Sequence, residues 1–156
     1  MVQETVKLLE SQALIHRIDM LTDIPSHLPL VLCDQNQLKQ VFMNIIKNAM
    51  ESMPNGGELH IQVKLIDHIQ ISVSIIDQGC GIPQERLDRL GEPFYTTKEK
   101  GTGLGLMVTR KIFENHQGKM VIRSEVGKGT CVEVLFPVIL SPEQSTVDEI
   151  LHQCSS

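Results

Sequence analysis

The sequence contains very few aromatic residues. Of its 156 residues only 3% are aromatic, with four phenylalanines, one tyrosine and no tryptophan. Such a chain cannot build the row of aromatic rings on which nucleic-acid bases stack, or an aromatic sugar-binding cleft. Phe94 and Tyr95 are adjacent and lie outside any apolar periodicity. Their position therefore indicates a role other than filling the core.

Further absences narrow the class of protein. No apolar run approaches the ~18–20 residues that cross a bilayer, and residues 1–10 lack the pattern of a secretory signal. The four cysteines and six histidines have no metal-ligand spacing, so we expect reduced thiols and no metal bound through these residues. The net charge of −5 argues against nucleic acid as a partner. We expect a cytoplasmic location, with a parent protein that could be membrane-anchored.

Hydrophobic periodicity predicts a single domain of alternating helices and strands. Helices are expected over residues 2–15, from Asp34 (as N-cap) to residue 53, and over residues 83–90 and 104–116. Strands are expected over residues 17–24, 58–66, 69–77, 119–124 and 130–137, with a glycine-rich loop over residues 91–105. The expected organisation is an N-terminal helix (1–15), a globular domain (16–140) and a polar tail (141–156).

Asn44 and Asn48 lie four residues apart on the second predicted helix, so their side chains are neighbours. An amide oxygen can serve as a single ligand of a Mg²⁺ ion that takes its other ligands from phosphates and water. Two solvated asparagines on a polar helix face are the alternative. The pattern alone leaves both open.

Asp77 follows the inward-facing alternation of a predicted strand, so its carboxylate should be buried. A buried carboxylate requires a partner, and the amino group of adenine would supply one. Gly79 and Gly81 would allow a sharp turn and the close approach of a planar group. Thr130 is inward-facing on another strand. A simple turn that closes the strand is the alternative.

A run of glycines over residues 101–106 precedes a predicted helix. Backbone N–H groups at such a position can bind an anion, and Lys98 and Lys100 lie just upstream. The spacing matches neither the Walker P-loop nor the dinucleotide-binding fingerprint. A flexible surface loop is the alternative.

Taken in order, five motifs resemble the ATP-binding domain of sensor histidine kinases, in the superfamily that includes gyrase B, Hsp90 and MutL. The similarity covers roughly residues 10–137, and residues 91–108 are especially similar to sporulation sensor kinases of spore-forming Gram-positive bacteria. The motifs are Asn44-Ile45-Ile46-Lys47-Asn48-Ala49, Asp77-x-Gly79-x-Gly81, Glu92-Pro93-Phe94-Tyr95-Thr96-Thr97-Lys98, Gly101-Thr102-Gly103-Leu104-Gly105-Leu106 and Gly127-x-Gly129-Thr130.

The resemblance implies an α/β (α+β) fold of the Bergerat type, a two-layer sandwich with a mixed β-sheet covered on one face by helices. It implies ATP and Mg²⁺ as cofactors, with Asn48 on the metal and Asp77, supported by Thr130, on the adenine amino group. Phe94 and Tyr95 would pin a mobile lid when ATP is bound. The other implied nucleotide-binding residues are Asn44, Gly79, Gly81, Ile82, Lys98, Gly101, Thr102, Gly103, Leu104, Gly105 and Leu106.

Asn44 and Lys98 are the implied catalytic residues, and Asn44 marks a departure from the hydrolytic relatives. Gyrase B and MutL carry a water-activating glutamate there, and asparagine cannot act as a general base at neutral pH. We therefore expect ATP to be held for transfer to another group and not hydrolysed efficiently.

No histidine of the chain lies in the H-E-x-x-x-P motif that carries the acceptor in sensor kinases. The resemblance therefore implies a catalytic fragment that phosphorylates a histidine on a separate dimerisation domain. The parent kinase is expected to be a homodimer and the fragment a monomer. A response regulator would act downstream. An anti-sigma-factor serine kinase and a nucleotide-gated ATPase clamp remain as alternatives.

Overall fold

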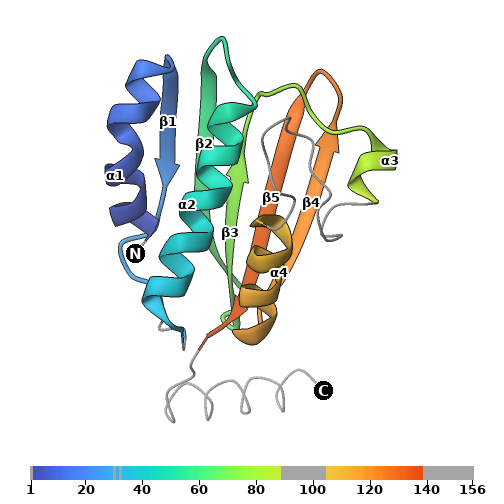
Figure 1. Cartoon of the computed structure of the whole chain (residues 1–156). Coiled ribbons are helices and arrows are strands. Elements are labelled where there is room, and N and C mark those ends of the chain that lie inside the picture. The colour runs from blue at the N-terminus through green and yellow to red at the C-terminus, as the bar shows by residue number, and fades with distance from the viewer. Residues whose placement is uncertain (1, 30, 32, 89–104, 139–156) are drawn as a thin grey trace, which may run out of the picture.

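The computed structural model describes residues 2–29, 31, 33–88 and 105–138, which form one sheet with helices on a single face (Figure 1). The helices are α1 (Val2–Ile15), α2 (Gln35–Glu51), α3 (Gln84–Leu87) and α4 (Gly105–Asn115). The strands are β1 (Ile18–Asp23), β2 (Gly57–Ile66), β3 (Gln70–Ile76), β4 (Lys119–Glu125) and β5 (Gly129–Pro137). The predicted elements are confirmed wherever the structure describes them, with ends that differ from the prediction by at most three residues.

The sheet is mixed, as expected, with the strand order β1-β2-β3-β5-β4. Strands β1 and β2 are parallel, and α2 provides the crossover between them; the other neighbouring pairs are antiparallel. Ile61 pairs with Ile75, and Val73 pairs with Val134, so buried side chains from three strands lie next to one another. These pairs form the sheet side of the core.

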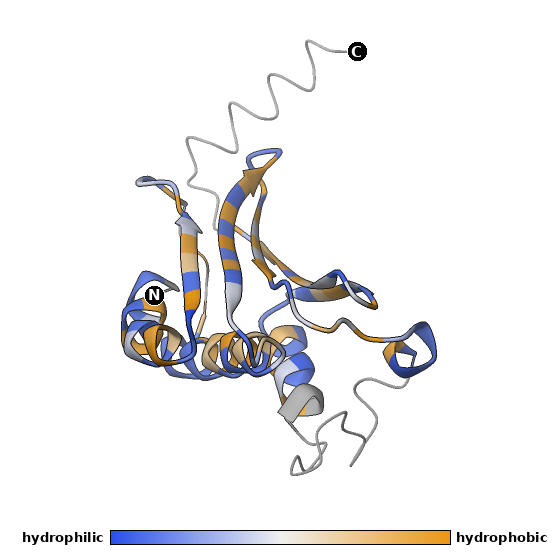
Figure 2. Ribbon diagram, turned by 90° about the horizontal axis from the view of Figure 1, so that it is seen from above, coloured by the Kyte–Doolittle hydropathy of each residue, from blue (hydrophilic) through white to orange (hydrophobic). Residues whose placement is uncertain are grey.

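The β2–β3 hairpin departs from the predicted pattern near its turn. Leu65 and Ile69 continue the apolar alternation of the two strands, but they are 37% and 49% exposed because the helix layer does not cover this end of the hairpin (Figure 2). Asp67 and His68 form the turn with φ angles of 52° and 60°. Both residues have the left-handed backbone conformation that a type I′ turn requires, although the turn lacks the usual Asn-Gly sequence.

Helices α1, α2 and α4 make up the second layer (Figure 2). Helix α2 begins as predicted, because the Asp34 side chain accepts hydrogen bonds from the backbone N–H groups of Asn36 and Gln37. Its buried residues recur at intervals of three and four and face the sheet: Leu38, Val41, Phe42, Ile45, Ile46, Ala49 and Met50. This apolar stripe fixes which face of α2 remains available for other groups.

Three of the five aromatic residues form one cluster in the core. Phe42 of α2, Phe113 of α4 and Phe136 of β5 lie with ring centroids 5.6 to 6.4 Å apart and with tilted or edge-on geometry. Such pairs are favoured beyond the area that they bury. The cluster therefore joins α2 and α4 to the sheet.

Several predictions about absent features can be checked on the described residues. Cys33, Cys80 and Cys131 are free, as expected. No helix in the described part of the chain is long and apolar enough to cross a membrane. The pair Phe94–Tyr95, most of the predicted loop over residues 91–105 and the tail over residues 141–156 lie outside the described residues.

Candidate functional site

Three segments meet at one end of the sheet, at the top of Figure 1: the C-terminal end of α2, the loop after β3 and the β4–β5 turn. The Asp77 backbone N–H donates to the Thr130 carbonyl over 2.9 Å, and the Gly127 N–H donates to the Cys80 carbonyl over 2.9 Å. These bonds tie the loop after β3 to the β4–β5 turn. Residues predicted from three distant motifs are thus brought together.

Asp77 is the buried carboxylate of this site, with only 7% of its surface exposed. Its Oδ1 accepts hydrogen bonds from the backbone N–H groups of Gly79, over 2.9 Å, and of Thr130, over 3.1 Å. Burial raises the pKa of Asp77, and these two hydrogen bonds oppose the rise. The predicted need for a partner is thus met partly by the protein's own backbone. An ionised carboxylate offers about four acceptor positions, so capacity for a further donor remains.

Ser52, which the sequence analysis missed, also contacts this carboxylate. It follows α2 directly, and its hydroxyl donates to the Ala49 carbonyl over 2.6 Å. The same hydroxyl lies near Asp77 and helps to lower the pKa of that carboxyl group, after the larger effects of the Gly79 and Thr130 N–H groups. Ser52 lies four residues after Asn48 and eight after Asn44, so an extension of the i, i+4 pattern by one step would have found it.

Glycine is required at two positions of this edge. Gly129 has a φ angle of +126°, and a Cβ atom there would overlap the backbone carbonyl of Asp77. Gly81 has a φ angle of +75°, and its Cβ would overlap the carbonyl of Glu125. Both backbones approach closely and in a conformation that other residues rarely adopt. The glycines therefore let the loop after β3 rest directly on the β4–β5 turn.

A second hydroxyl that the sequence analysis missed belongs to Ser124 of β4, which pairs directly with Thr130 of β5. The Ser124 hydroxyl accepts from the backbone N–H of Ile82 over 2.8 Å, donates to the Gly129 carbonyl over 2.9 Å, and lies 2.8 Å from the Thr130 hydroxyl. Its position two residues after Ile122 on β4 puts it on the same side of the strand, which was the available signal. Ser124 thereby links the predicted residues Ile82 and Thr130.

The two predicted asparagines lie on α2, beside the apolar stripe. Asn44 is half-buried, Asn48 is exposed, and the Asn48 carbonyl accepts a hydrogen bond from the Ser52 N–H over 3.1 Å. The Ser52 hydroxyl also helps to lower the pKa of Asp77. Asn48 is therefore one helical turn from the residue that contacts the buried carboxylate, and Asn44 is two turns away.

Comparison with known proteins identifies the family of this chain. Residues 33–140 match the family described as "Histidine kinase-, DNA gyrase B-, and HSP90-like ATPase". The chain belongs to this family. The match includes Asn44, Asn48, Asp77 and Thr130.

Named relatives agree with the family match. The chain is 47% identical to sporulation kinase E of Bacillus subtilis (strain 168) over 147 residues, which cover 94% of this chain and 20% of that protein. It is 50% identical to sporulation kinase A of the same organism over 137 residues, covering 88% of this chain and 22% of that protein. The chain thus spans about a fifth of the length of these curated relatives.

Solved structures give the same result. The catalytic domain of histidine kinase ThkA superposes with a TM-score of 0.78 at 30% identity, covering 88% of this chain and 91% of that one. The predicted fold and family are confirmed: the chain is an ATP-binding catalytic domain of the histidine kinase type. The relatives favour this interpretation over the serine kinase and the ATPase clamp.

Part of the predicted phosphate-binding motif cannot be placed. Gly105 is the first residue of α4, followed by Leu106. Lys98 and the residues Gly101, Thr102, Gly103 and Leu104 lie outside the described residues. The described part of the candidate site therefore consists of the motifs around Asp77 and Thr130, the α2 asparagines and the start of α4.

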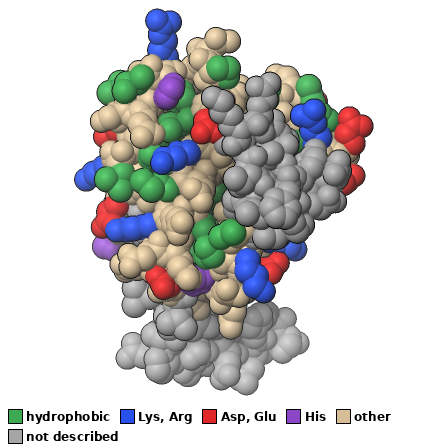
Figure 3. Space-filling view, in the orientation of Figure 1, with side chains coloured by type: hydrophobic (Ala, Val, Ile, Leu, Met, Phe, Trp, Pro, Cys, Tyr) green, Lys and Arg blue, Asp and Glu red, His purple; other side chains and the backbone are tan. Residues whose placement is uncertain are grey.

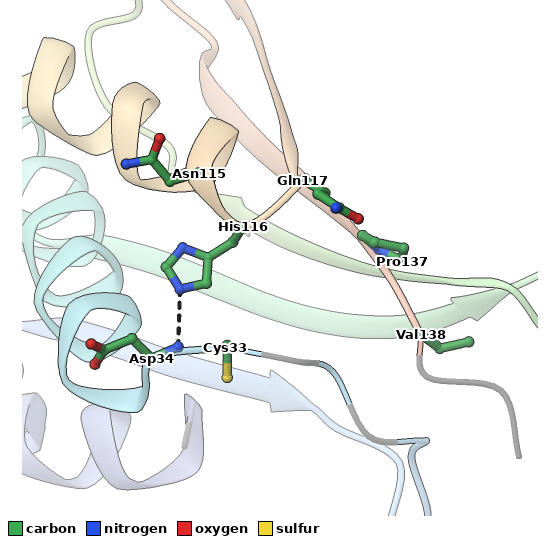
Figure 4. A pocket seen from close by; sticks show the side chains of 7 residues that line it. All are labelled: Cys33, Asp34, Asn115, His116, Gln117, Pro137 and Val138. Carbon is green, nitrogen blue, oxygen red and sulfur yellow. Dashed lines mark hydrogen bonds between the residues drawn. The ribbon is translucent and has the colours of Figure 1, made fainter.

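A separate hollow of about 410 Å³ lies at the opposite end of α2 and α4 (Figure 4). Its lining includes Cys33, Asp34 and His116 and none of the predicted site residues. The His116 Nε2 accepts a hydrogen bond from the Asp34 N–H over 2.9 Å, so a direct hydrogen bond links the two helices at this end.

On the part of the helix face that the structure describes, Lys and Arg side chains are scattered and form no single basic patch (Figure 3).

Proposed function

We propose that this domain binds ATP with Mg²⁺ at the edge around Asp77 and transfers the γ-phosphate to a histidine on a separate dimerisation domain. The observation that carries the proposal is Asp77 itself. Its Oδ1 is held by the N–H groups of Gly79 and Thr130, while acceptor capacity remains for a ligand donor. An amino group on a planar base matches this site.

Adenine recognition would be divided between two strands. Asp77 would accept from the exocyclic amino group, and Thr130, whose backbone already holds the carboxylate, would support it. Gly79, Gly81 and Ile82 would line the base, because they form the loop that rests on the β4–β5 turn. Burial of the carboxylate makes each of these hydrogen bonds stronger than it would be in water.

The donor set fits Mg²⁺ that is bound mainly through phosphates. Among the described residues, no group of three or more His, Cys, Asp and Glu side chains could hold a metal ion. The amide oxygen of Asn48 would supply one protein ligand, with phosphate oxygens and water as the others. When bound, the ion neutralises charge on the phosphates and holds them in place.

Asn44 would bind and orient the nucleotide without activating water. An amide has no basic lone pair at neutral pH, so it cannot deprotonate a water molecule. We propose Lys98 and the segment over residues 101–106 as the phosphate-binding groups, with Gly105 at the helix N-terminus. The site would thus keep ATP for transfer, a reaction that depends mostly on positioning and charge neutralisation.

The partners follow from this chemistry. The acceptor would be the dimerisation domain of the same homodimeric kinase, and a response regulator would receive the phosphoryl group from it. Nucleic acid is not proposed as a partner, given the net charge of −5.

The test is phosphoryl transfer in a defined mixture. The chain is incubated with radiolabelled ATP, Mg²⁺ and a purified dimerisation domain that carries the acceptor histidine. We expect label on the acceptor that is lost in acid and stable in base. An acid-stable phosphoserine would overturn the histidine assignment, and rapid phosphate release without an acceptor would point to the ATPase clamp.

A matched control separates binding from transfer. The same mixture with an acceptor domain whose histidine is replaced by glutamine should bind ATP equally and take up no label. Calorimetric titration of the chain with ATP and Mg²⁺ provides the binding measurement. Absence of ATP binding would refute the proposed site itself.

A further inference from the structure

The hydroxyl of Ser124 has a complete set of hydrogen-bond partners. It contacts the Ile82 N–H at 2.8 Å, the Gly129 carbonyl at 2.9 Å and the Thr130 hydroxyl at 2.8 Å. A serine hydroxyl has one proton to donate and two lone pairs that accept. Three partners therefore occupy the one donor and both acceptor positions of the Ser124 hydroxyl.

The direction of each bond can be worked out from the partners. The Gly129 carbonyl can only accept, so the single Ser124 proton is donated to it. The Ile82 N–H can only donate, and it occupies one Ser124 lone pair. In the remaining contact, the Thr130 hydroxyl must donate to Ser124.

Thr130 consequently has no donor left for a ligand. Its hydroxyl proton is directed to Ser124, and its backbone N–H donates to the Asp77 carboxylate over 3.1 Å. The Thr130 oxygen keeps a lone pair, and its side chain is half-buried, so part of it remains accessible. Thr130 and Asp77 thus form two neighbouring acceptors.

A pair of acceptors distinguishes between two kinds of purine. An exocyclic amino group carries two N–H bonds and can donate to both oxygens, whereas a carbonyl oxygen at the same ring position would face two acceptors without a proton between them. A site built to hydrogen-bond a ligand group discriminates strongly against a ligand that leaves its groups unpaired. The geometry therefore favours 6-aminopurines over 6-oxopurines.

We propose that Ser124 is a positioning residue for base selection: by accepting the Thr130 proton, it fixes Thr130 as an acceptor and disfavours 6-oxopurine nucleotides. Ser124 acts through Thr130 and need not touch the base. The inference rests on the proposed function, because it requires a purine against Asp77. Without the Ser124 hydroxyl, Thr130 could turn its proton towards a carbonyl oxygen of the base.

A purely structural role for Ser124 gives a different result. Loss of its bonds to Ile82 and Gly129 would loosen the loop and weaken every nucleotide by the same factor. The ratio of the affinities for inosine triphosphate and ATP would then stay constant. This ratio is therefore the informative measurement.

The experiment is a double-mutant cycle between Ser124 and Thr130. Dissociation constants for ATP and inosine triphosphate, each with Mg²⁺, are measured by calorimetry for the unchanged chain, Ser124→Ala, Thr130→Val and the double variant. In Ser124→Ala we expect the preference for ATP to fall by roughly threefold to tenfold, which is the contribution of one hydrogen bond. In the Thr130→Val background, Ser124→Ala should leave the preference unchanged.

Two results would overturn the inference: an unchanged preference in Ser124→Ala, or an equal fall in the Thr130→Val background. If Ser124→Ala does not fold, the pair Ser124→Thr and Ser124→Val gives the same comparison, since the two side chains have similar shapes and only threonine keeps the hydroxyl. Ser74→Ala, a hydroxyl deletion whose partner is Glu133, is the matched control and should change neither affinity. A chain that fails to bind ATP at all refutes the proposed function, and the inference with it; ATP binding with an unaltered ratio refutes only the inference.

Discussion

The two ends of α2 differ in their surroundings: one packs against the rest of the fold, and the other lies near the buried carboxylate of Asp77. At its N-terminal end, Asp34 caps the helix, and the Asp34 N–H is bonded to His116 of α4. About two turns further on, Phe42 joins the aromatic cluster with α4 and β5. At its C-terminal end, Ser52 contacts the Asp77 carboxylate and follows Asn48 by one turn.

The two ends differ in how many of their hydrogen-bonding groups already have partners within the protein. The N-terminal end is closed by rings in contact and by a direct bond between two helices. The C-terminal end brings the Ser52 hydroxyl near the Asp77 carboxylate, which keeps acceptor capacity beyond its bonds to Gly79 and Thr130. One helix thus stabilises the fold at one end and contributes to the proposed ATP site at the other, so changes at the two ends should have separable effects.

Replacement of Phe113 by alanine should have the largest effect on stability. Phe113 is 0% exposed and contacts both other rings of the cluster. Removing a buried phenylalanine leaves a cavity and costs about 3–5 kcal/mol. Urea denaturation monitored by circular dichroism measures this loss. Leu14→Ala, at a side chain that is 77% exposed, is the control and should change the free energy of unfolding little; similar losses in the two variants would contradict the described core.

Replacement of Asp77 by asparagine should act on the other end of α2 and spare the fold. The amide oxygen can still accept from Gly79 and Thr130, but the amide nitrogen presents N–H groups to the adenine amino group. We expect ATP affinity to fall by about a hundredfold or more, the loss that follows when a charged acceptor is removed and an unpaired donor is left. Calorimetry measures the affinity, and denaturation measures the stability. Undiminished ATP binding would eliminate Asp77 as the base contact.

The stability of the unchanged chain and of Asp77→Asn should also depend differently on pH, which is a smaller effect with a defined sign. Burial raises the pKa of Asp77, so the folded state holds this proton more tightly than the unfolded state does. The stability due to Asp77 is therefore present below the unfolded pKa and is lost as the pH rises through the folded pKa. As the pH rises through that range, the free energy of unfolding of the unchanged chain should fall relative to that of Asp77→Asn. A relative rise would contradict the burial of this carboxylate.

Much of this fold was predictable because its signals are local. The apolar stripe of α2 and its Asp34 cap lie within one stretch of sequence, as does the alternation that turns Asp77 inward. Sequence-based predictions fail where the burial of a side chain depends on segments that are distant in the sequence. Ile69 follows the alternation, yet it is exposed because no helix covers that end of the hairpin.

The candidate site shows the same limit. The motif residues Asp77 and Thr130 were predicted, but their shared hydrogen bond depends on the pairing of β3 with β5, which no local pattern specifies. Ser52 and Ser124 were missed because serine is common on surfaces and becomes informative only when its partners are known. The parallel pairing of β1 with β2 likewise depends on the crossover through α2.

Replacement of Asp34 by alanine should give the smallest effect of the series, and it should be confined to stability. The Asp34 carboxylate caps two N–H groups, at 3.0 and 3.2 Å, whereas the bond to His116 uses the backbone N–H and survives the change. Loss of a helix cap costs about 1 kcal/mol. Asp34→Asn keeps a capping oxygen and is the matched control, expected within about 0.5 kcal/mol of the unchanged chain because asparagine caps helices as well as aspartate does. ATP affinity should be equal in all three proteins, because this cap is more than three turns from Ser52; an affinity that fell with the cap would show that the two ends of α2 are coupled.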